Sequence, residues 1–170
     1  MSQADHPRPR VLVAAVMQVK SRAVEALAKA VVDTVDRAAV TLVRSVVVKG
    51  ERQYIRQLVS NVANDNEADA IILVGGAGIG PRDDTCEAID GFVERRIEGF
   101  GEAYRRLLEV ELGAHAFLSR ATAGVHNQCL VFAMTGRVVE VSRAMEALVL
   151  PTLSEAVELA TGRRKAVDPR

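Results

Sequence analysis

The chain of 170 residues has no tryptophan, only two cysteines and no excess of either charge. Its 22 basic side chains balance 22 acidic ones, so it lacks the electrostatic footprint of a protein that binds nucleic acid. No apolar run approaches the roughly 20 residues that a helix needs to span a bilayer. The opening MSQADHPRPR also lacks the apolar core of a signal peptide. These absences argue against nucleic-acid and membrane partners.

Cys86 and Cys129 are far apart and show neither CxxC nor Cys/His spacing. We therefore expect reduced, buried thiols in a cytoplasmic protein. His115 and His126 lie on separate segments, which favours surface or packing roles over metal binding.

Apolar residues make up 49% of the chain, enough for one full core. We expect a single domain over residues 11–161, a disordered N-terminus over 1–10 and a frayed tail over 162–170. Short apolar runs at 11–16, 40–48 and 68–74 predict strands, and three- to four-residue apolar spacing at 21–38 and 51–65 predicts helices. This β-α-β-α-β order is typical of an α/β fold with a mostly parallel sheet covered on both faces.

The second half of the chain continues the alternation. Helical spacing predicts helices over 85–97, 99–113 and 137–150, and Pro151 is expected to open a last helix that reaches about residue 160. Strands are expected over 117–125 and 129–134, and the tripeptide HNQ between them indicates a β-hairpin.

The stretch AIILVGGAGIGPRDDTCEAID, residues 70–90, follows the third predicted strand and carries four glycines. Such a loop brings backbone amides close to an anion, and phosphate is its natural ligand. Neither common nucleotide fingerprint fits, since Gly76, Gly78 and Gly80 give G-x-G-x-G and no lysine follows. Asp83 and Asp84 would repel phosphate unless a divalent cation or a hydroxyl-rich ligand intervenes. The alternative is a tight strand-to-helix turn with Asp84 as N-cap.

The segment GGAGIGPRDDTCEAI resembles the GGTGxxxRDxTPEA signature of the molybdopterin-binding MogA/MoaB-like family. EGFGEAYRRL, LSRATAGV and FAMTGRVVEVSRAMEALVLPTL follow in that family's order, so that the resemblance covers about residues 40–153. It implies a three-layer α/β/α fold, assembly into trimers or hexamers, and molybdopterin bound at the glycine loop. In active members the chemistry is adenylation of molybdopterin with ATP and Mg²⁺.

The resemblance also assigns residues. Asp83 matches the acidic residue tied to catalysis and metal, and the residues that match cofactor-binding positions are Gly75, Gly76, Gly78, Arg82, Ser119, Arg120 and Gly136. Ala77, Cys86 and Thr135 replace the signature's threonine and two prolines.

Two larger departures concern catalysis. The serine- and aspartate-rich loop that usually joins the first strand to the first helix is shortened here, and Gly50 stands where a second aspartate is expected, beside Glu51. Glu51 is thus the candidate to replace that aspartate as a metal ligand. Two hypotheses remain open, an adenylyltransferase-like enzyme and a catalytically weakened binding or scaffold protein, with a general nucleotide- or sugar-phosphate-binding domain as an outside alternative.

The first helix is apolar over more of its circumference than one core-facing stripe requires, with alanine, valine or leucine at most positions from Ala23 to Val32. This favours a homo-oligomer, although packing between the sheet and the C-terminal helices of the same subunit would also explain it.

Overall fold

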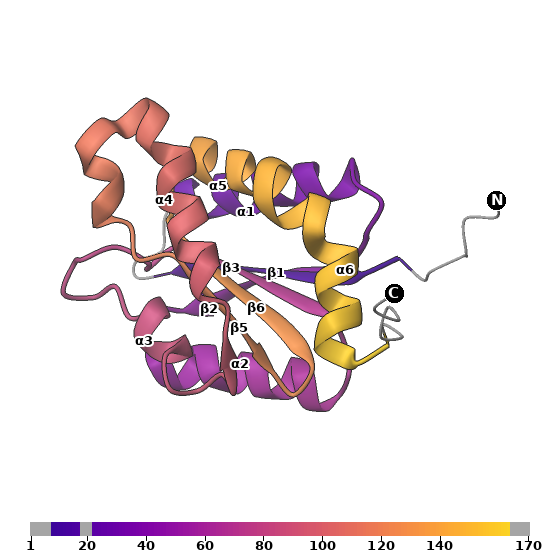
Figure 1. Cartoon of the computed structure of the whole chain (residues 1–170). Helices are drawn as coiled ribbons and strands as arrows, with labels where there is room; N and C mark the ends of the chain where they lie inside the picture. The colour runs from indigo at the N-terminus through magenta and orange to yellow at the C-terminus, as the bar shows by residue number, and fades with distance from the viewer. Residues whose placement is uncertain (1–7, 18–21, 164–170) are drawn as a thin grey trace, which may run out of the picture.

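The computed structural model describes residues 8–17 and 22–163. These residues form a six-stranded sheet in the order β2-β1-β3-β6-β5-β4, with helices on both faces (Figure 1). The predicted short connection after the first strand falls on residues 18–21 and lies outside the described residues, as do residues 1–7 and 164–170. The expected α/β fold is confirmed.

Four neighbouring strands run parallel, namely β2 (Thr41–Lys49), β1 (Arg10–Met17), β3 (Ala70–Val74) and β6 (Cys129–Met134). β5 (Thr122–His126) and β4 (Arg95–Arg96) extend the sheet with antiparallel pairings. All residues of β3 and β6 are buried, as expected for central strands that helices cover on both faces.

The core has two halves, one on each side of the sheet. One half contains α1 (Arg22–Asp36), α4 (Glu98–Leu112), α5 (Val138–Ala144) and α6 (Leu150–Thr161). The other contains α2 (Arg52–Asn64) and α3 (Thr85–Ile89). Alternate residues of the strands feed the two halves, since Ile72 belongs to the first and Ile71 to the second. The three-layer α/β/α arrangement is visible in Figure 1.

The topology places two loops at one edge of the sheet. β1 has β2 on one side and β3 on the other, so the strand order reverses there, which is where open α/β sheets bind ligands. The glycine loop, residues 75–84, follows β3, and the loop 135–137 follows the adjacent parallel strand β6. Both loops therefore lie at the carboxyl edge of the sheet.

The expected hairpin is confirmed. β5 and β6 pair antiparallel, and Asn127 and Gln128 join them with φ values of 44° and 66°. Two consecutive residues with positive φ are typical of the type I′ turns that suit a two-residue hairpin.

Two predicted elements are wrong in extent. The helix expected over 85–97 ends as α3 at Ile89, because Gly91 takes a left-handed φ of 72° and the next residues run to β4, which pairs with β5. The strand expected over 117–125 begins only at Thr122. Before it, Gly113–Leu118 form η1, a 3₁₀ helix that continues from α4.

The C-terminal helices form one continuous run where two separate helices were expected. A π-helical turn, η2 (Met145–Val149), joins α5 to α6, and the N–H of Leu150 donates to the carbonyl of Met145 five residues earlier. Pro151 has no N–H for an ordinary helical bond, so a local widening of the helix at this point has a physical cause.

The first helix is sandwiched within its own subunit. α1 packs against β1, β2 and α5, and its residues Leu27, Val31 and Val35 are buried in the core. This packing accounts for the apolar excess of α1 without a partner. Oligomerisation therefore stays a prediction that α1 does not support independently.

The chain ends differ in part from expectation. Arg10 belongs to β1, and its Nη2 lies 2.9 Å from Oδ1 of Asp69, so the disorder expected over 1–10 is wrong for this residue. Gly162, with a φ of 69°, closes α6. The rest of the predicted tail, residues 164–170, lies outside the described residues. Within residues 8–17 and 22–163, every helix is too short or too polar to cross a bilayer.

Candidate functional site

The glycine loop turns sharply out of β3. Gly75 and Gly76 have φ values of 104° and 65°, a region that side chains with a Cβ rarely adopt. A Cβ on Gly75 would also lie 2.9 Å from the carbonyl oxygen of Val16 in β1. Thr85 closes the loop, because its hydroxyl donates to Gly75 at 2.7 Å and its N–H donates to Gly76 at 3.0 Å.

Asp83 folds back into the loop that precedes it. Its Oδ2 accepts a 2.9 Å hydrogen bond from the N–H of Gly80. A Cβ on Gly78 or Gly80 would lie within 2.8 Å of that same oxygen. The alternating glycines of the sequence therefore make room for the Asp83 carboxylate.

Three consecutive backbone N–H groups of the loop have no acceptor within the part of the chain that the structure describes. The amides of Gly76, Ala77 and Gly78 donate to none of the described residues, although Ala77 is almost fully buried. Buried backbone donors are nearly always paired, and successive free amides in a turn form a concave anion site. The three amides are thus available to an anionic ligand.

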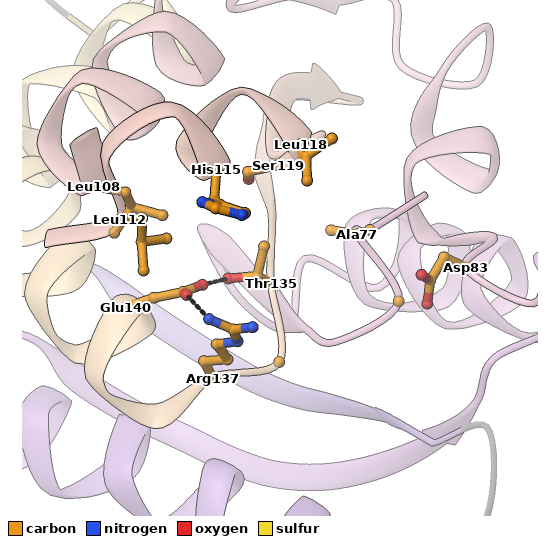
Figure 2. A pocket seen from close by; sticks show the side chains of 13 residues that line it. Ala77, Asp83, Leu108, Leu112, His115, Leu118, Ser119, Thr135, Arg137 and Glu140 are labelled. Carbon is orange, nitrogen blue, oxygen red and sulfur yellow. Dashed lines mark hydrogen bonds and ion pairs between the residues drawn. The ribbon is translucent and has the colours of Figure 1, made fainter. Parts of the chain in front are cut away.

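A cavity of about 450 Å³ opens beside these amides, within the size range of small-molecule sites (Figure 2). The glycine loop, Asp83, Ser119 and Gly136 form one part of its wall. Three leucines from α4 and η1, Leu108, Leu112 and Leu118, form an apolar part. The cavity therefore suits a ligand with an anionic group and an apolar or aromatic body.

A chain of polar side chains reaches the cavity from the core. Tyr104, fully buried in α4, lies with its hydroxyl 2.6 Å from Oγ1 of Thr135. Thr135 donates a 2.6 Å hydrogen bond to Oε2 of Glu140, and Nη1 of Arg137 donates to Oε1 at 3.2 Å (Figure 2). Burial raises the pKa of Tyr104 to about 12, so its hydroxyl keeps its proton at ordinary pH.

Five residues assigned from the sequence meet at the cavity. The cavity wall contains Gly76, Gly78, Asp83, Ser119 and Gly136. Gly136 comes from the loop after β6, and Ser119 directly follows η1.

The other assigned residues lie elsewhere. Gly75 does not line the cavity itself but packs against Gly136, which does. A Cβ on Gly136 would lie 3.5 Å from the Cα of Gly75. Arg82 is exposed and does not line the cavity. Arg120 faces a second, smaller cavity of about 190 Å³. Glu51 is exposed at the N-terminus of α2 and does not line the main cavity.

Asp84 occupies the N-cap position of α3 but makes no side-chain cap bond, which corrects that expectation. Its Oδ1 instead lies 2.9 Å from Nη2 of Arg52 in α2. The helix α3 has only five residues, so it lacks the macrodipole of a long helix.

Both cysteines are buried, as expected. Burial raises the pKa of Cys86 and that of Cys129 to about 12, so neither thiol is an activated nucleophile. Among the described residues, no group of three or more His, Cys, Asp or Glu side chains could hold a metal ion. Asp83 thus offers one carboxylate, and Mg²⁺ would need most of its oxygen ligands from bound phosphate or water.

The sequence did not single out the apolar wall, Glu140 or Arg137. The leucines repeat at helical spacing and are indistinguishable from core residues by sequence. His115, expected at the surface or in packing, is exposed at the cavity, while His126 stacks on Phe92 with ring centroids 4.3 Å apart.

The chain matches a protein-family model described as "Probable molybdopterin binding domain" over residues 12–155. It is 39% identical over 112 residues to molybdenum cofactor biosynthesis protein B of Bacillus subtilis (strain 168), covering 65% of this chain and 66% of that protein, just under two thirds. It is also 39% identical over 124 residues to the protein of that name from Staphylococcus aureus (strain MRSA252), covering 72% and 73%.

Solved structures share the fold over nearly the whole chain. A crystal structure of molybdenum cofactor biosynthesis protein B superposes with a TM-score of 0.85 at 27% identity and covers 92% of this chain and 98% of that one. The molybdopterin biosynthesis enzyme MoaB from Thermus thermophilus superposes with a TM-score of 0.78, also at 27% identity, and covers 91% and 97%.

Proposed function

The chain belongs to the molybdopterin-binding domain family, as a molybdenum cofactor biosynthesis protein of the MoaB type, and we propose on this premise that it binds molybdopterin in the glycine-loop cavity. The observation that carries this proposal is the run of free amides at Gly76, Ala77 and Gly78. These donors fit the terminal phosphate of molybdopterin. The leucine wall then offers an apolar surface to the planar pterin.

Adenylation of the bound molybdopterin with ATP and Mg²⁺ is the second candidate function. Asp83 favours it, because its carboxylate lines the cavity next to the proposed phosphate site. There it would contribute one oxygen ligand to Mg²⁺, which when bound would neutralise phosphate charge.

The missing second carboxylate favours binding over catalysis. Gly50 is buried and its N–H donates to Met17, while Glu51 does not line the cavity. The other carboxylate that lines the cavity, Glu140, is already hydrogen-bonded by Thr135. A reaction that depends on two free carboxylates would therefore lack one of them here, and such a loss usually costs orders of magnitude in rate. A binding or scaffold protein is thus the function that the geometry supports best.

Calorimetry on the full chain tests the binding site. Gly76→Val should remove molybdopterin binding, because valine disfavours a φ of 65° and its side chain would crowd the free amides. Gly99→Ala is the matched control, since a Cβ there meets no atom within 4 Å. Unchanged affinity in a Gly76→Val protein that still melts cooperatively would place the pocket elsewhere. Stronger binding of a nucleotide or sugar phosphate than of molybdopterin would support the outside alternative.

Incubation of the protein with molybdopterin, ATP and Mg²⁺, followed by mass spectrometry of the products, distinguishes an adenylyltransferase from a binding protein. An adenylylated product that disappears in Asp83→Asn would establish the enzyme. Asparagine still offers an oxygen to the N–H of Gly80, so the loop should keep its shape in this variant. Binding without product would establish the binder.

We also propose a trimer or hexamer and a cytoplasmic location. Exposed valines on the edge strand β2, Val43 and Val47, offer an apolar surface of the kind that subunit contacts cover. The two unpaired cysteines agree with a reducing compartment.

A further inference from the structure

The hydrogen bonds between Tyr104 and Glu140 have a defined direction. Thr135 has a single hydroxyl proton and donates it to Oε2 of Glu140. The 2.6 Å contact between Tyr104 and Thr135 must therefore be donated by the tyrosine. Two aligned O–H dipoles thus point toward the Glu140 carboxylate, which strengthens both bonds.

Glu140 and Arg137, the last two residues of this series of hydrogen bonds, differ sharply in exposure. The side chain of Glu140 is 7% exposed and that of Arg137 is 73% exposed. Burying a carboxylate is costly unless it is paired, and an exposed arginine normally samples many rotamers. The hydrogen bond to Glu140 restricts this freedom of the Arg137 guanidinium.

Arg137 is placed to meet a ligand. It is the only lysine or arginine among the described residues that line the cavity. Among those residues, Glu140 alone accepts from its guanidinium, and only through Nη1. Gly136, the residue before it, packs against Gly75, so Arg137 directly follows a contact with the glycine loop that carries the free amides. Arg82 does not line the cavity, and the Arg120 guanidinium is paired with Glu87.

We propose that Arg137 is the cation that binds the phosphate-bearing group in this cavity, and that Glu140, Thr135 and Tyr104 are positioning residues that act through it. This inference rests on the proposed function, since it assumes an anion at the glycine loop. The remaining N–H groups of Arg137 would complete the cradle formed by the Gly76, Ala77 and Gly78 amides. Guanidinium groups bind phosphate oxygens through such paired donors.

Titration calorimetry of the full chain with inorganic pyrophosphate provides the test. Arg137→Gln should weaken binding by roughly tenfold, the effect of one lost charge-assisted hydrogen bond. Arg137→Lys should fall in between, because lysine keeps the charge but loses the paired geometry. Arg95→Gln is the matched control: it removes the same charge from an exposed position away from the cavity. It should bind pyrophosphate as tightly as the unmodified chain.

Glu140→Gln discriminates a positioning role from simple electrostatics. The substitution removes a negative charge from the cavity, so charge alone predicts tighter anion binding. The positioning role predicts weaker binding, by roughly threefold to tenfold, because the guanidinium loses its anchor. In an Arg137→Gln background the same substitution should no longer weaken binding, since Glu140 acts through Arg137.

Separate titrations with molybdopterin and with ATP then identify the phosphate that Arg137 serves. Weakened binding of either ligand in Arg137→Gln supports the proposal and shows which ligand carries the phosphate that Arg137 binds. Unchanged affinity for all three probes, tighter binding in Glu140→Gln, or an equal loss in Arg95→Gln would overturn it while leaving the glycine-loop site intact. If the unmodified chain binds none of the probes, the proposed function fails as well.

Discussion

Arg120 and Glu87 form an ion pair, with Nη2 of the arginine 2.5 Å from Oε1 of the glutamate. The same arginine is hydrogen-bonded to the glycine loop, through its N–H to Ala77 at 3.0 Å and through Nη1 to Gly78 at 3.5 Å. The hydrogen bond with Glu87 raises the pKa of Arg120. This geometry gives Arg120 the means to support the loop from outside the cavity.

Arg120→Ala should therefore destabilise the protein by roughly 1–3 kcal/mol, because it leaves the partly buried Glu87 without its partner. Hydrogen exchange should become faster at Gly80, the loop residue whose N–H is hydrogen-bonded to Asp83. The double variant Arg120→Met with Glu87→Gln should recover most of the stability, as measured by urea unfolding. If stability recovers but pyrophosphate affinity stays low, Arg120 contacts the ligand directly, as the family resemblance implied.

Asp84→Ala should cost only about 0.5 kcal/mol, the usual value of an exposed ion pair, and less than the roughly 1 kcal/mol of a helix cap. The reason is that its carboxylate contacts Arg52 and makes no cap bond with α3. A double-mutant cycle with Arg52→Ala, followed by urea unfolding, measures the pair. If Asp84→Ala lowers the free energy of unfolding by the same amount in the Arg52→Ala background, Asp84 stabilises the protein as a helix cap after all.

Thr135→Val should destabilise the fold by roughly 1–3 kcal/mol, although valine has nearly the same shape. The substitution leaves the buried hydroxyl of Tyr104 without its acceptor and removes the hydroxyl donor to Glu140. The loss should shrink when Tyr104→Phe is added, because no orphaned hydroxyl then remains. Thermal unfolding of the single and double variants gives the comparison, and strictly additive losses would contradict a connected chain.

The Arg10–Asp69 pair should make stability depend on pH in the acid range. Burial acts to raise the pKa of Asp69, but hydrogen bonds from the side chain and N–H of Arg10 outweigh it and hold that pKa below its ordinary 3.8. A carboxyl with a lowered folded pKa stabilises the protein above its unfolded pKa. That contribution is lost as the pH falls through the folded value.

Urea unfolding between pH 6 and pH 2 measures this effect, with about 1 kcal/mol expected from Asp69. Glu67 titrates in the same range, since its bond with Arg44 also lowers its pKa. Asp69→Asn should therefore flatten the acid dependence only in part. If stability depends on pH in the same way in Asp69→Asn, Asp69 does not contribute to the acid dependence.

Light scattering at micromolar concentration should give three or six times the subunit mass of 18.3 kDa. Val47→Lys on the edge strand β2 should lower that mass if the exposed valines form the contact, because a charged side chain would have to be buried. A mass of 18.3 kDa for the unmodified chain would reject the assembly.

The sequence by itself determined the layered architecture and the position of the candidate site. Apolar runs and helical spacing are local signals, and they specified the central strands, the hairpin at Asn127 and the glycine loop after β3. The positions that match the family signature then located Gly76, Gly78 and Asp83 at the cavity.

Only the tertiary structure decided which charged groups meet. Asp84 reads as a helix cap in sequence, yet Arg52 on another helix takes its carboxylate. The family resemblance assigned Arg82 and Arg120 to cofactor binding, but packing turns Arg120 toward Glu87. At the cavity, Glu140 accepts one hydrogen bond from Thr135 and another from Arg137. The physical reason is that apolar burial follows a local period, whereas an ion pair depends on which distant segment the fold brings within a few ångströms.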